Sequence, residues 1–318
     1  MKKSRPNCAP HVEAGRKQND NKNQNPMSTK LKAKDPAATE PRKPQIVIYG
    51  PPGVGKTWFS LSFTGPVYYI DTEGGASRAH YMDRLKAGGG AYLGPEDGSN
   101  DFETIIGQVK ALATEKHEFK TVVIDSITKP FISAIASEGE RLGEKNAFGA
   151  DKKPAIQSMR RLIAAVHRLD MAVIFVAHEK ADWGEVNGQR TEIGKAPDTY
   201  DKLIYEMDLS LQISKRGPAR TALVKKSRLL GFPEGESFTL DFATFAERYG
   251  RDVIERAPTQ IVLATAQQVA EINRLTTLLK TDAATIEKWL DKANAESFAE
   301  LNTSQASKII DFLNKQLQ

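Results

Sequence analysis

Short apolar runs alternate along the chain with longer segments in which apolar residues recur every three or four positions. Four runs have the composition of buried strands: Ile46–Tyr49, Val67–Ile70, Thr121–Ile124 and Ala172–Val176. Three longer segments have helical spacing: Phe102–Thr114, Ile127–Leu142 and Pro154–Leu169. Because strand and helix alternate, the pattern predicts an α/β fold in which a mostly parallel sheet lies between helices.

The pattern changes twice in the second half of the chain. Two further strands, Met207–Ser214 and Arg220–Lys226, flank Lys215-Arg216-Gly217-Pro218, and the Gly-Pro pair predicts the turn of a hairpin. From Pro258 only helical stripes follow; their apolar positions are Val269, Ile272, Leu275, Leu278, Leu279, Ile286, Trp289, Leu290, Ile309, Ile310 and Leu313. We therefore expect a core over residues 45–250 and a small helical domain over residues 258–318.

The first 44 residues differ from the rest in composition. They are rich in Lys, Asn, Pro and Gln and nearly free of large apolar side chains, which predicts a disordered tail. The net charge of the chain is +5, but the first 45 residues hold eleven Lys or Arg and four Asp or Glu, so the remainder is slightly acidic. The tail is either a solubilising arm or a weak, salt-sensitive contact for nucleic acid. Met27 is a second candidate start site.

Composition excludes several classes of protein. No run approaches the ~20 apolar residues that a membrane-spanning helix needs, and the N-terminus lacks the apolar stretch of a signal peptide. The single cysteine, Cys8, allows neither an internal disulfide nor a cysteine-based zinc site. We therefore expect a cytoplasmic protein that does not enter membranes and whose metal chemistry, if any, uses oxygen ligands.

A glycine-rich motif directly follows the first strand. Residues 50–57 match the pattern GxxxxGK[ST] and are Gly50, Pro51, Pro52, Gly53, Val54, Gly55, Lys56 and Thr57. In such a P-loop, backbone N–H groups surround phosphate oxygens, the lysine reaches the β- and γ-phosphates, and the Thr hydroxyl ligates Mg²⁺. The helical pattern of Trp58–Phe63 comes next, as the motif requires. The motif predicts that the chain binds ATP and Mg²⁺.

Acidic residues follow two of the predicted strands. Asp125 ends the strand Thr121–Ile124 and is a candidate for holding Mg²⁺; it could also cap the next helix, and the two roles are compatible. Position 126, where many AAA+ ATPases have a glutamate, is a serine, so the residue that activates water must come from elsewhere. Glu73 lies just beyond the strand Val67–Ile70, where active sites of open α/β sheets collect. It is a candidate general base, although Glu-Gly-Gly is also ordinary loop sequence.

The order and spacing of four segments resemble a known superfamily. GPPGVGKT, YYIDTEGG, TVVIDSIT and VIFVAHEK occur in this order within residues 45–245. Together they resemble the core of the RecA-like recombinase ATPases, and more narrowly the phage-encoded members associated with single-strand annealing and recombination. The resemblance implies that Glu73 is the general base, that Asp125 serves Mg²⁺, and that His178 stands where the family usually has a glutamine that senses the γ-phosphate. A histidine that is merely hydrogen-bonded at a strand end is the alternative.

The resemblance also implies two surface sites. Residues 179–200 occupy the position of a mobile DNA-contacting loop, where the candidate contacts to single-stranded DNA are Lys180, Trp183, Arg190 and Lys195. Five acids in the same segment weaken that interpretation, and a flexible surface loop is the alternative. Lys226 and Arg228 resemble the basic pair that reaches the nucleotide of a neighbouring subunit, although they could also form a solvated strand end.

The resemblance thus predicts an ATP-hydrolysing homo-oligomer, a ring or a filament, that handles single-stranded DNA in homologous recombination or annealing. A single-strand-binding or recombination protein would be a further partner, and a phage-encoded protein would work in the cytoplasm of its bacterial host. The first alternative is an ATP-dependent assembly switch or scaffold for protein partners. The second is a small-molecule P-loop kinase, which is disfavoured because no arginine-rich lid is evident.

Overall fold

A computed structural model describes residues 41–317 except residues 64, 76–78 and 147–148. Its centre is an eight-stranded sheet with the order β10-β9-β8-β1-β5-β4-β2-β3. The strands are β1 (Gln45–Tyr49), β2 (Val67–Asp71), β3 (Ala91–Leu93), β4 (Thr121–Asp125), β5 (Ala172–Ala177), β8 (Leu209–Arg216), β9 (Ala219–Ser227) and β10 (Ser237–Thr239). The six neighbouring strands β8, β1, β5, β4, β2 and β3 are parallel to one another, whereas β9 runs antiparallel to both of its neighbours. The predicted fold class, a RecA-like P-loop core with a mostly parallel sheet, is confirmed.

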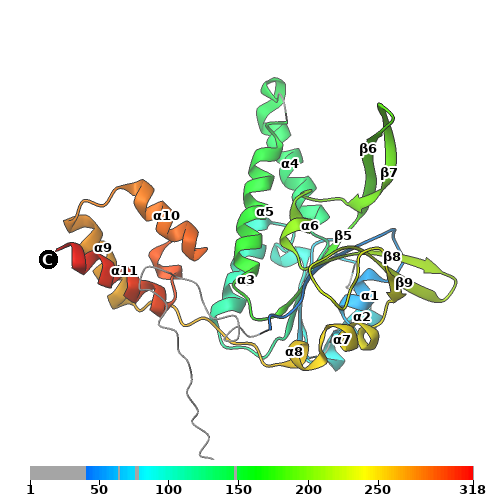
Figure 1. Cartoon of the computed structure of the whole chain (residues 1–318), viewed down its shortest axis with the longest axis horizontal. Coiled ribbons are helices and arrows are strands. Elements are labelled where there is room, and N and C mark those ends of the chain that lie inside the picture. Colours follow the sequence, from blue (N-terminus) through cyan, green and yellow to red (C-terminus); the bar gives the residue numbers. More distant parts are fainter. Residues whose placement is uncertain (1–40, 64, 76–78, 147–148, 318) are drawn as a thin grey trace, which may run out of the picture. The chain divides into compact units, whose positions relative to one another are not determined.

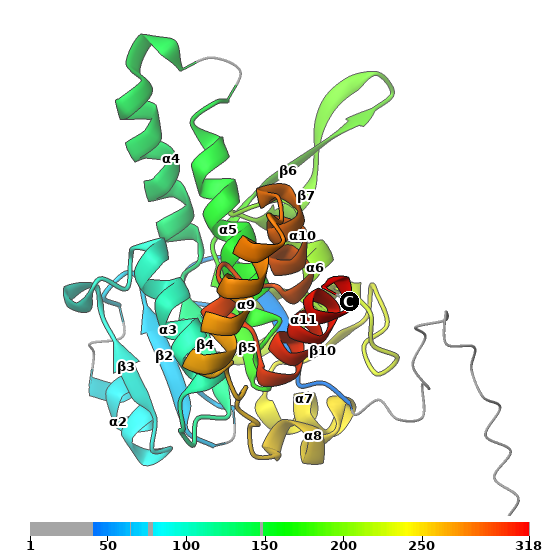
Figure 2. The same ribbon diagram turned by 90° about the vertical axis from the view of Figure 1, so that its left-hand side faces the viewer.

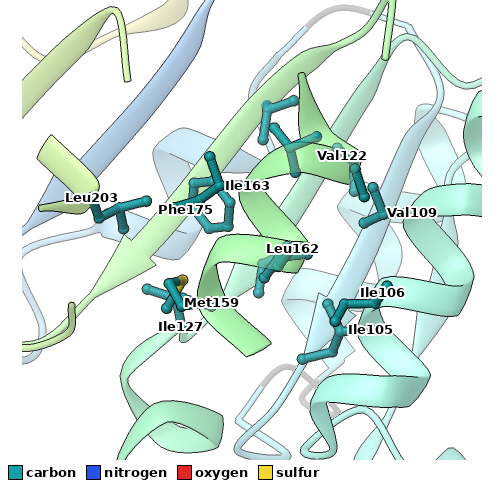
Figure 3. Close-up of a cluster of buried hydrophobic side chains, with 14 of the residues drawn as sticks. Ile105, Ile106, Val109, Val122, Ile127, Met159, Leu162, Ile163, Phe175 and Leu203 are labelled. Atoms are coloured by element: carbon teal, nitrogen blue, oxygen red, sulfur yellow. The ribbon is translucent and has the colours of Figure 1, made fainter. Parts of the chain in front are cut away.

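Helices cover both faces of the sheet (Figure 1). One face carries α3 (Phe102–Thr114), α4 (Thr128–Leu142) and α5 (Lys152–Val166); the other carries α1 (Lys56–Ser60), α2 (Ala79–Ala87), α7 (Phe242–Tyr249) and α8 (Arg251–Glu255). Figure 3 shows the first face, where Ile105 and Val109 of α3 and Leu162 of α5 lie with Val122 and Phe175 of the strands. Successive side chains of a strand point to opposite faces of the sheet, and both faces are buried. This burial fixes the register of the central strands.

The elements that the pattern did not predict are short or half exposed. Strand β3 is three residues long and only partly buried, because it forms the edge of the sheet. Helix α2 lies next to β3 in the chain and buries few of its side chains. Short edge elements hold too few apolar residues to produce a recognisable period.

The segment after β5 differs from its prediction. The expectation of a flexible loop over residues 179–200 was wrong, because the chain forms a separate two-stranded hairpin of β6 (Glu179–Val186) and β7 (Gln189–Pro197). Asn187 and Gly188 make its turn with φ of 53° and 77°. An Asn-Gly pair with two positive φ angles is the favoured two-residue hairpin connection, so the sequence did contain the signal. Figures 1 and 2 both show this ribbon extending away from the central sheet.

The C-terminal segment is helical, as expected. Its helices are α9 (Ala266–Leu278), α10 (Ala283–Ala293) and α11 (Thr303–Gln316). Side chains cap all three N-termini, those of Thr265, Asp282 and Asn302. Their apolar cluster, around Ile272 and Leu301, is separate from the clusters of the sheet. The division of the chain into residues 45–250 and 258–318 stays a prediction.

Ion pairs join the helical segment to the α/β core. Glu296 pairs with Lys110 of α3 and with Arg161 of α5, and Glu300 pairs with Lys110 as well. Hydrogen bonds from Arg161 and Lys110 lower the pKa of the Glu296 carboxyl to about 2. The ion pairs are partly exposed, so they orient the helical segment more than they stabilise it.

Two expectations concern the remaining residues. The predicted tail, up to residue 40, lies outside the described residues, and so do Cys8 and Met27. Within the described ranges, no helix has both the length and the apolar composition that a membrane crossing requires.

Candidate functional site

The P-loop connects β1 to α1 at the carboxyl edge of the sheet. Gly50, Gly53 and Gly55 all have positive φ, with 75° at Gly53 and 95° at Gly55. Gly50 also lies so close to the carbonyl of Ile213 in β8 that a side chain at position 50 would collide with that backbone. The glycines of the motif are therefore required by the backbone conformation and by close packing. Thr57 and Lys56 occupy the first turn of α1.

Lys56 lies folded onto its own loop. Its Nζ donates hydrogen bonds to the carbonyl oxygens of Gly50 at 2.7 Å and Pro51 at 2.9 Å. Burial lowers the pKa of the Lys56 ammonium, and the negative charges of Asp125 and Glu179 act in the opposite direction. The ammonium thus sits in a partly desolvated position in which a phosphate oxygen can replace a carbonyl as its acceptor.

Asp125 lies beside Thr57, as the motifs predict. Its Oδ2 accepts hydrogen bonds from Thr57 Oγ1 at 2.5 Å and from Tyr69 OH at 3.0 Å. Burial raises the pKa of the Asp125 carboxyl, which the two hydrogen bonds partly offset. One carboxylate oxygen next to one hydroxyl is a donor set that fits Mg²⁺, which prefers oxygen ligands and completes its shell with phosphate and water. Within the part of the chain that the structure describes, no cluster of three or more His, Cys, Asp or Glu side chains forms a fuller metal site.

Glu73 is held at the same edge of the sheet. Asp71, at the end of β2, accepts the backbone N–H groups of Glu73 and Gly74 and so turns the chain. Ser126, the residue after Asp125, donates its Oγ hydrogen bond to Glu73 Oε1 at 2.6 Å. The same oxygen lies 2.8 Å from His178 Nε2. The structure therefore brings Glu73, Asp125 and His178 together from the ends of three neighbouring strands.

The hairpin is attached directly to this edge. Its first strand begins at the residue after His178. Its second strand runs back to the edge of the sheet, where the Lys195 carbonyl accepts a hydrogen bond from Tyr49 OH at 3.1 Å. Tyr49 is buried and is the last residue of β1, immediately before the P-loop. Burial raises the pKa of its hydroxyl, so Tyr49 donates throughout the neutral range. Both ends of the hairpin thus contact residues that adjoin the nucleotide motifs.

The four candidate DNA contacts are distributed along the hairpin. The Trp183 side chain is 52% exposed, and the Arg190 guanidinium lies 5.3 Å from the centroid of its ring. Lys180 pairs with Asp201, and Lys195 pairs with Glu192. Trp183 and Arg190 therefore form an exposed pair on one face, whereas both lysines are engaged by carboxylates.

Lys226 and Arg228 lie at the opposite edge of the sheet from the P-loop. Strand β9 runs antiparallel to β8, so its end at Ser227 pairs with Leu209, where β8 begins. There Lys226 Nζ donates to the carbonyl of Met207, and the Arg228 guanidinium donates to the carbonyl of Tyr205. The pair therefore lies away from the P-loop of its own chain.

Sequence reasoning missed three residues at the nucleotide edge. Ser126 was noted only because it is not a glutamate, yet its hydroxyl holds Glu73. Glu179 contributes negative charge next to Lys56, and its Oε2 is buried without a hydrogen-bond partner among the described residues. Arg220 of β9 contacts the P-loop at Gly55. Only the adjacency of Glu179 to His178 was visible in the sequence, because the other two contacts depend on how the chain folds.

Comparison with protein families identifies this arrangement. A model of an AAA domain family, AAA_24, matches residues 42–238, which is more than half of the chain. The chain belongs to this family. The matched region of this AAA_24 protein includes the P-loop, Asp125, Glu73 and the hairpin. Together with the confirmed fold, the match makes the chain a nucleotide-binding P-loop ATPase of the RecA-like type.

Several solved structures resemble the AAA_24 protein. One is a RadB recombinase, with 21% identity, 62% of this chain and 87% of that chain covered, and a TM-score of 0.39. Another is an ATPase from the type III secretion system of pathogenic bacteria, with 14% identity, 87% and 82% coverage and a TM-score of 0.37. A third is the flagellar accessory protein FlaH from Methanocaldococcus jannaschii, with 12% identity, 63% and 85% coverage and a TM-score of 0.34. The search of curated proteins gave no match.

Proposed function

We propose that the protein hydrolyses ATP at the P-loop with Mg²⁺ and couples this reaction to single-stranded DNA bound on the β6–β7 hairpin. The observation that carries the first half is the position of Glu73. Its carboxylate is fixed by Ser126 and lies at the sheet edge that also holds Thr57 and Asp125. A fixed carboxylate next to a P-loop is the group that a hydrolytic ATPase needs in addition to its binding motif.

In the proposed reaction, the P-loop backbone and Lys56 hold the phosphates of ATP, and Lys56 exchanges its carbonyl acceptors for phosphate oxygens. Thr57 and Asp125 would hold Mg²⁺, which when bound neutralises charge on the β- and γ-phosphates. Glu73 accepts a proton on a carboxylate oxygen from a water molecule whose oxygen attacks the γ-phosphorus. The bond from the γ-phosphorus to the β–γ bridging oxygen breaks, and ADP and inorganic phosphate are released.

His178 connects Glu73 to the hairpin. Its ring nitrogen lies against Glu73, its backbone N–H donates to Thr128 Oγ1 at 2.9 Å, and the next residue begins β6. A histidine in this position can donate to the γ-phosphate instead of to Glu73. We propose that this exchange transmits the state of the nucleotide to the hairpin.

Single-stranded DNA is the ligand proposed for the hairpin. Trp183 offers an exposed ring on which a base can stack, and Arg190 next to it can pair with phosphate. Recombination or strand annealing, of the phage-encoded type, is the process that the sequence resemblance implies. In an oligomer, Lys226 and Arg228 would act on the nucleotide of a neighbouring subunit, so replacing Arg228 should lower turnover without changing ATP affinity in the isolated subunit.

A protein partner is the second candidate ligand, and two observations favour it. Residues 179–197 contain four acids and three bases, a charge balance that does not attract DNA. Val186 and Ile193 are exposed, and Ile193 contacts Gly184, on the face opposite Trp183. Exposed aliphatic side chains of this kind suit a contact with another protein. In that case ATP would control an assembly rather than act on DNA.

Two measurements test the proposal in sequence. Phosphate release from ATP is measured with Mg²⁺ and again with excess EDTA; the proposal expects turnover only with Mg²⁺, and turnover that persists in EDTA would contradict it. Binding of a labelled single-stranded oligonucleotide is then measured at increasing salt. An affinity that falls as salt rises supports binding of single-stranded DNA by the hairpin. If no binding occurs at low salt, the protein partner becomes the proposed ligand.

A further inference from the structure

Arg220 is placed against the P-loop by strand pairing. It is the second residue of β9 and pairs with Lys215 of β8, the strand that lies next to β1. Its carbonyl accepts a hydrogen bond from the backbone N–H of Leu240 at 2.9 Å. The backbone at Arg220 is therefore fixed from both sides, and only the side chain is free to respond to a ligand.

The Arg220 side chain lies on the backbone of Gly55. A Cβ atom built at Gly55 would be 2.5 Å from Arg220 Nε and 2.9 Å from its Cδ. Gly55 is the residue before Lys56 and has a φ of 95°. Glycine at position 55 thus serves two purposes, the left-handed backbone and the space that the arginine occupies.

One nitrogen of the guanidinium, the buried Arg220 Nε, has no hydrogen-bond partner among the residues that the structure describes. A buried donor without an acceptor is costly, and an arginine is well suited to a phosphate because its N–H groups form a planar fork. Glu179 Oε2 is also buried without a partner among the described residues, but a carboxylate repels phosphate. Glu179 is therefore the weaker candidate for binding a phosphate group.

We propose that Arg220 binds a phosphate group of the nucleotide held by the P-loop of its own subunit. The inference rests on the proposed function, because it needs a nucleotide in the P-loop, and it adds a binding residue that no motif contains. Contact with Gly55 of the same chain fixes the assignment to the same subunit. Lys56 and Arg220 then approach the phosphates from two elements, α1 and β9.

The test compares Arg220→Ala with the wild-type protein in binding ATP, GTP and inorganic tripolyphosphate. Loss of a charge-assisted hydrogen bond should weaken all three ligands by about 10-fold or more, because they share only the phosphate chain. Arg216→Ala removes an exposed arginine at the end of β8, the strand that pairs with β9, and should leave all three affinities unchanged. Thermal unfolding of each variant without ligand shows whether it is folded, and Arg220→Lys provides a folded alternative that keeps the charge but loses the fork.

The outcomes separate this inference from the proposed function. Unchanged affinity of folded Arg220→Ala for all three ligands overturns the inference and leaves the P-loop assignment intact. Loss of affinity for ATP and GTP with unchanged affinity for tripolyphosphate also overturns it, because the arginine would then contact the base or ribose. Failure of the wild-type protein to bind ATP removes the proposed function itself.

Discussion

The nucleotide edge of the sheet and the β6–β7 hairpin adjoin in the chain but differ in how they are held. At the edge, Tyr69 is buried and hydrogen-bonded to the half-buried Asp125, and Glu73 is in contact with Ser126 and His178. In the hairpin, the side chains of Trp183 and Ile193 are 52% and 57% exposed, and the strands pair only with each other. The edge is organised for fixed geometry, whereas the hairpin exposes large side chains on its surface.

This difference suggests how the two regions divide the work. In the proposed reaction Glu73 must meet a water molecule. That step tolerates little displacement, and packing against the sheet supplies the precision. A two-stranded ribbon with few buried side chains can move at low cost when a ligand binds or leaves. The bonds at its base, Tyr49 to Lys195 and His178 to Glu73, would transmit such a movement to the nucleotide site.

The largest expected effect comes from Lys56→Ala. Without the ammonium, the β- and γ-phosphates lose the cation that the P-loop itself supplies, so ATP turnover should be abolished. Phosphate release in the steady state measures this. Lys288→Ala, on the surface of α10, is the matched control and should turn over ATP at the wild-type rate.

Glu73→Gln should lower hydrolysis by at least ~100-fold while ATP still binds, because an amide cannot accept the proton from water. Single-turnover hydrolysis and nucleotide binding are measured on the same preparation. Glu287→Gln on α10 controls for removal of an acid elsewhere. Normal turnover in Glu73→Gln would falsify the assignment of the base.

Trp183→Ala should weaken binding of single-stranded DNA by about 10-fold, since stacking of one base on an aromatic ring contributes ~1–3 kcal/mol. Fluorescence anisotropy of a labelled oligonucleotide measures the affinity. Tyr205→Ala removes another exposed aromatic side chain, outside the hairpin, and should have no effect. Equal affinity in Trp183→Ala and wild type would exclude a stacking role.

The smallest effect concerns stability and sharpens the contrast between the regions. Ile193→Ser in the hairpin should change the free energy of unfolding by less than about 0.5 kcal/mol, because the side chain is already exposed. Phe175→Ala in β5, which is fully buried, should lower it by ~3–5 kcal/mol. Denaturant unfolding of both variants measures the difference; similar losses would mean that the hairpin is part of the core.

The same contrast explains how much the sequence could predict. Strands β4 and β2, which lead into Asp125 and Glu73, are largely buried on both faces. Their apolar runs and the acids at their ends were therefore evident, and the structure places these acids together. The hairpin carries little apolar signal, and its Asn187-Gly188 turn was overlooked. Arg220 could not be predicted as a P-loop contact, because its position depends on strand β8 pairing with β1 across more than 150 residues of sequence. Lys226 and Arg228 were assigned from their resemblance to a basic pair that reaches the nucleotide of a neighbouring subunit, and that role stays a prediction.

The most direct test of the coupling between the two regions is the ATPase rate of wild type and Trp183→Ala, each measured with and without single-stranded DNA at several protein concentrations. We predict that single strands stimulate the wild-type rate, that the stimulation grows with protein concentration, and that Trp183→Ala keeps the basal rate but loses the stimulation. A rate that is the same with and without DNA, and the same in both proteins, would contradict the coupling and leave an ATPase whose hairpin serves another partner.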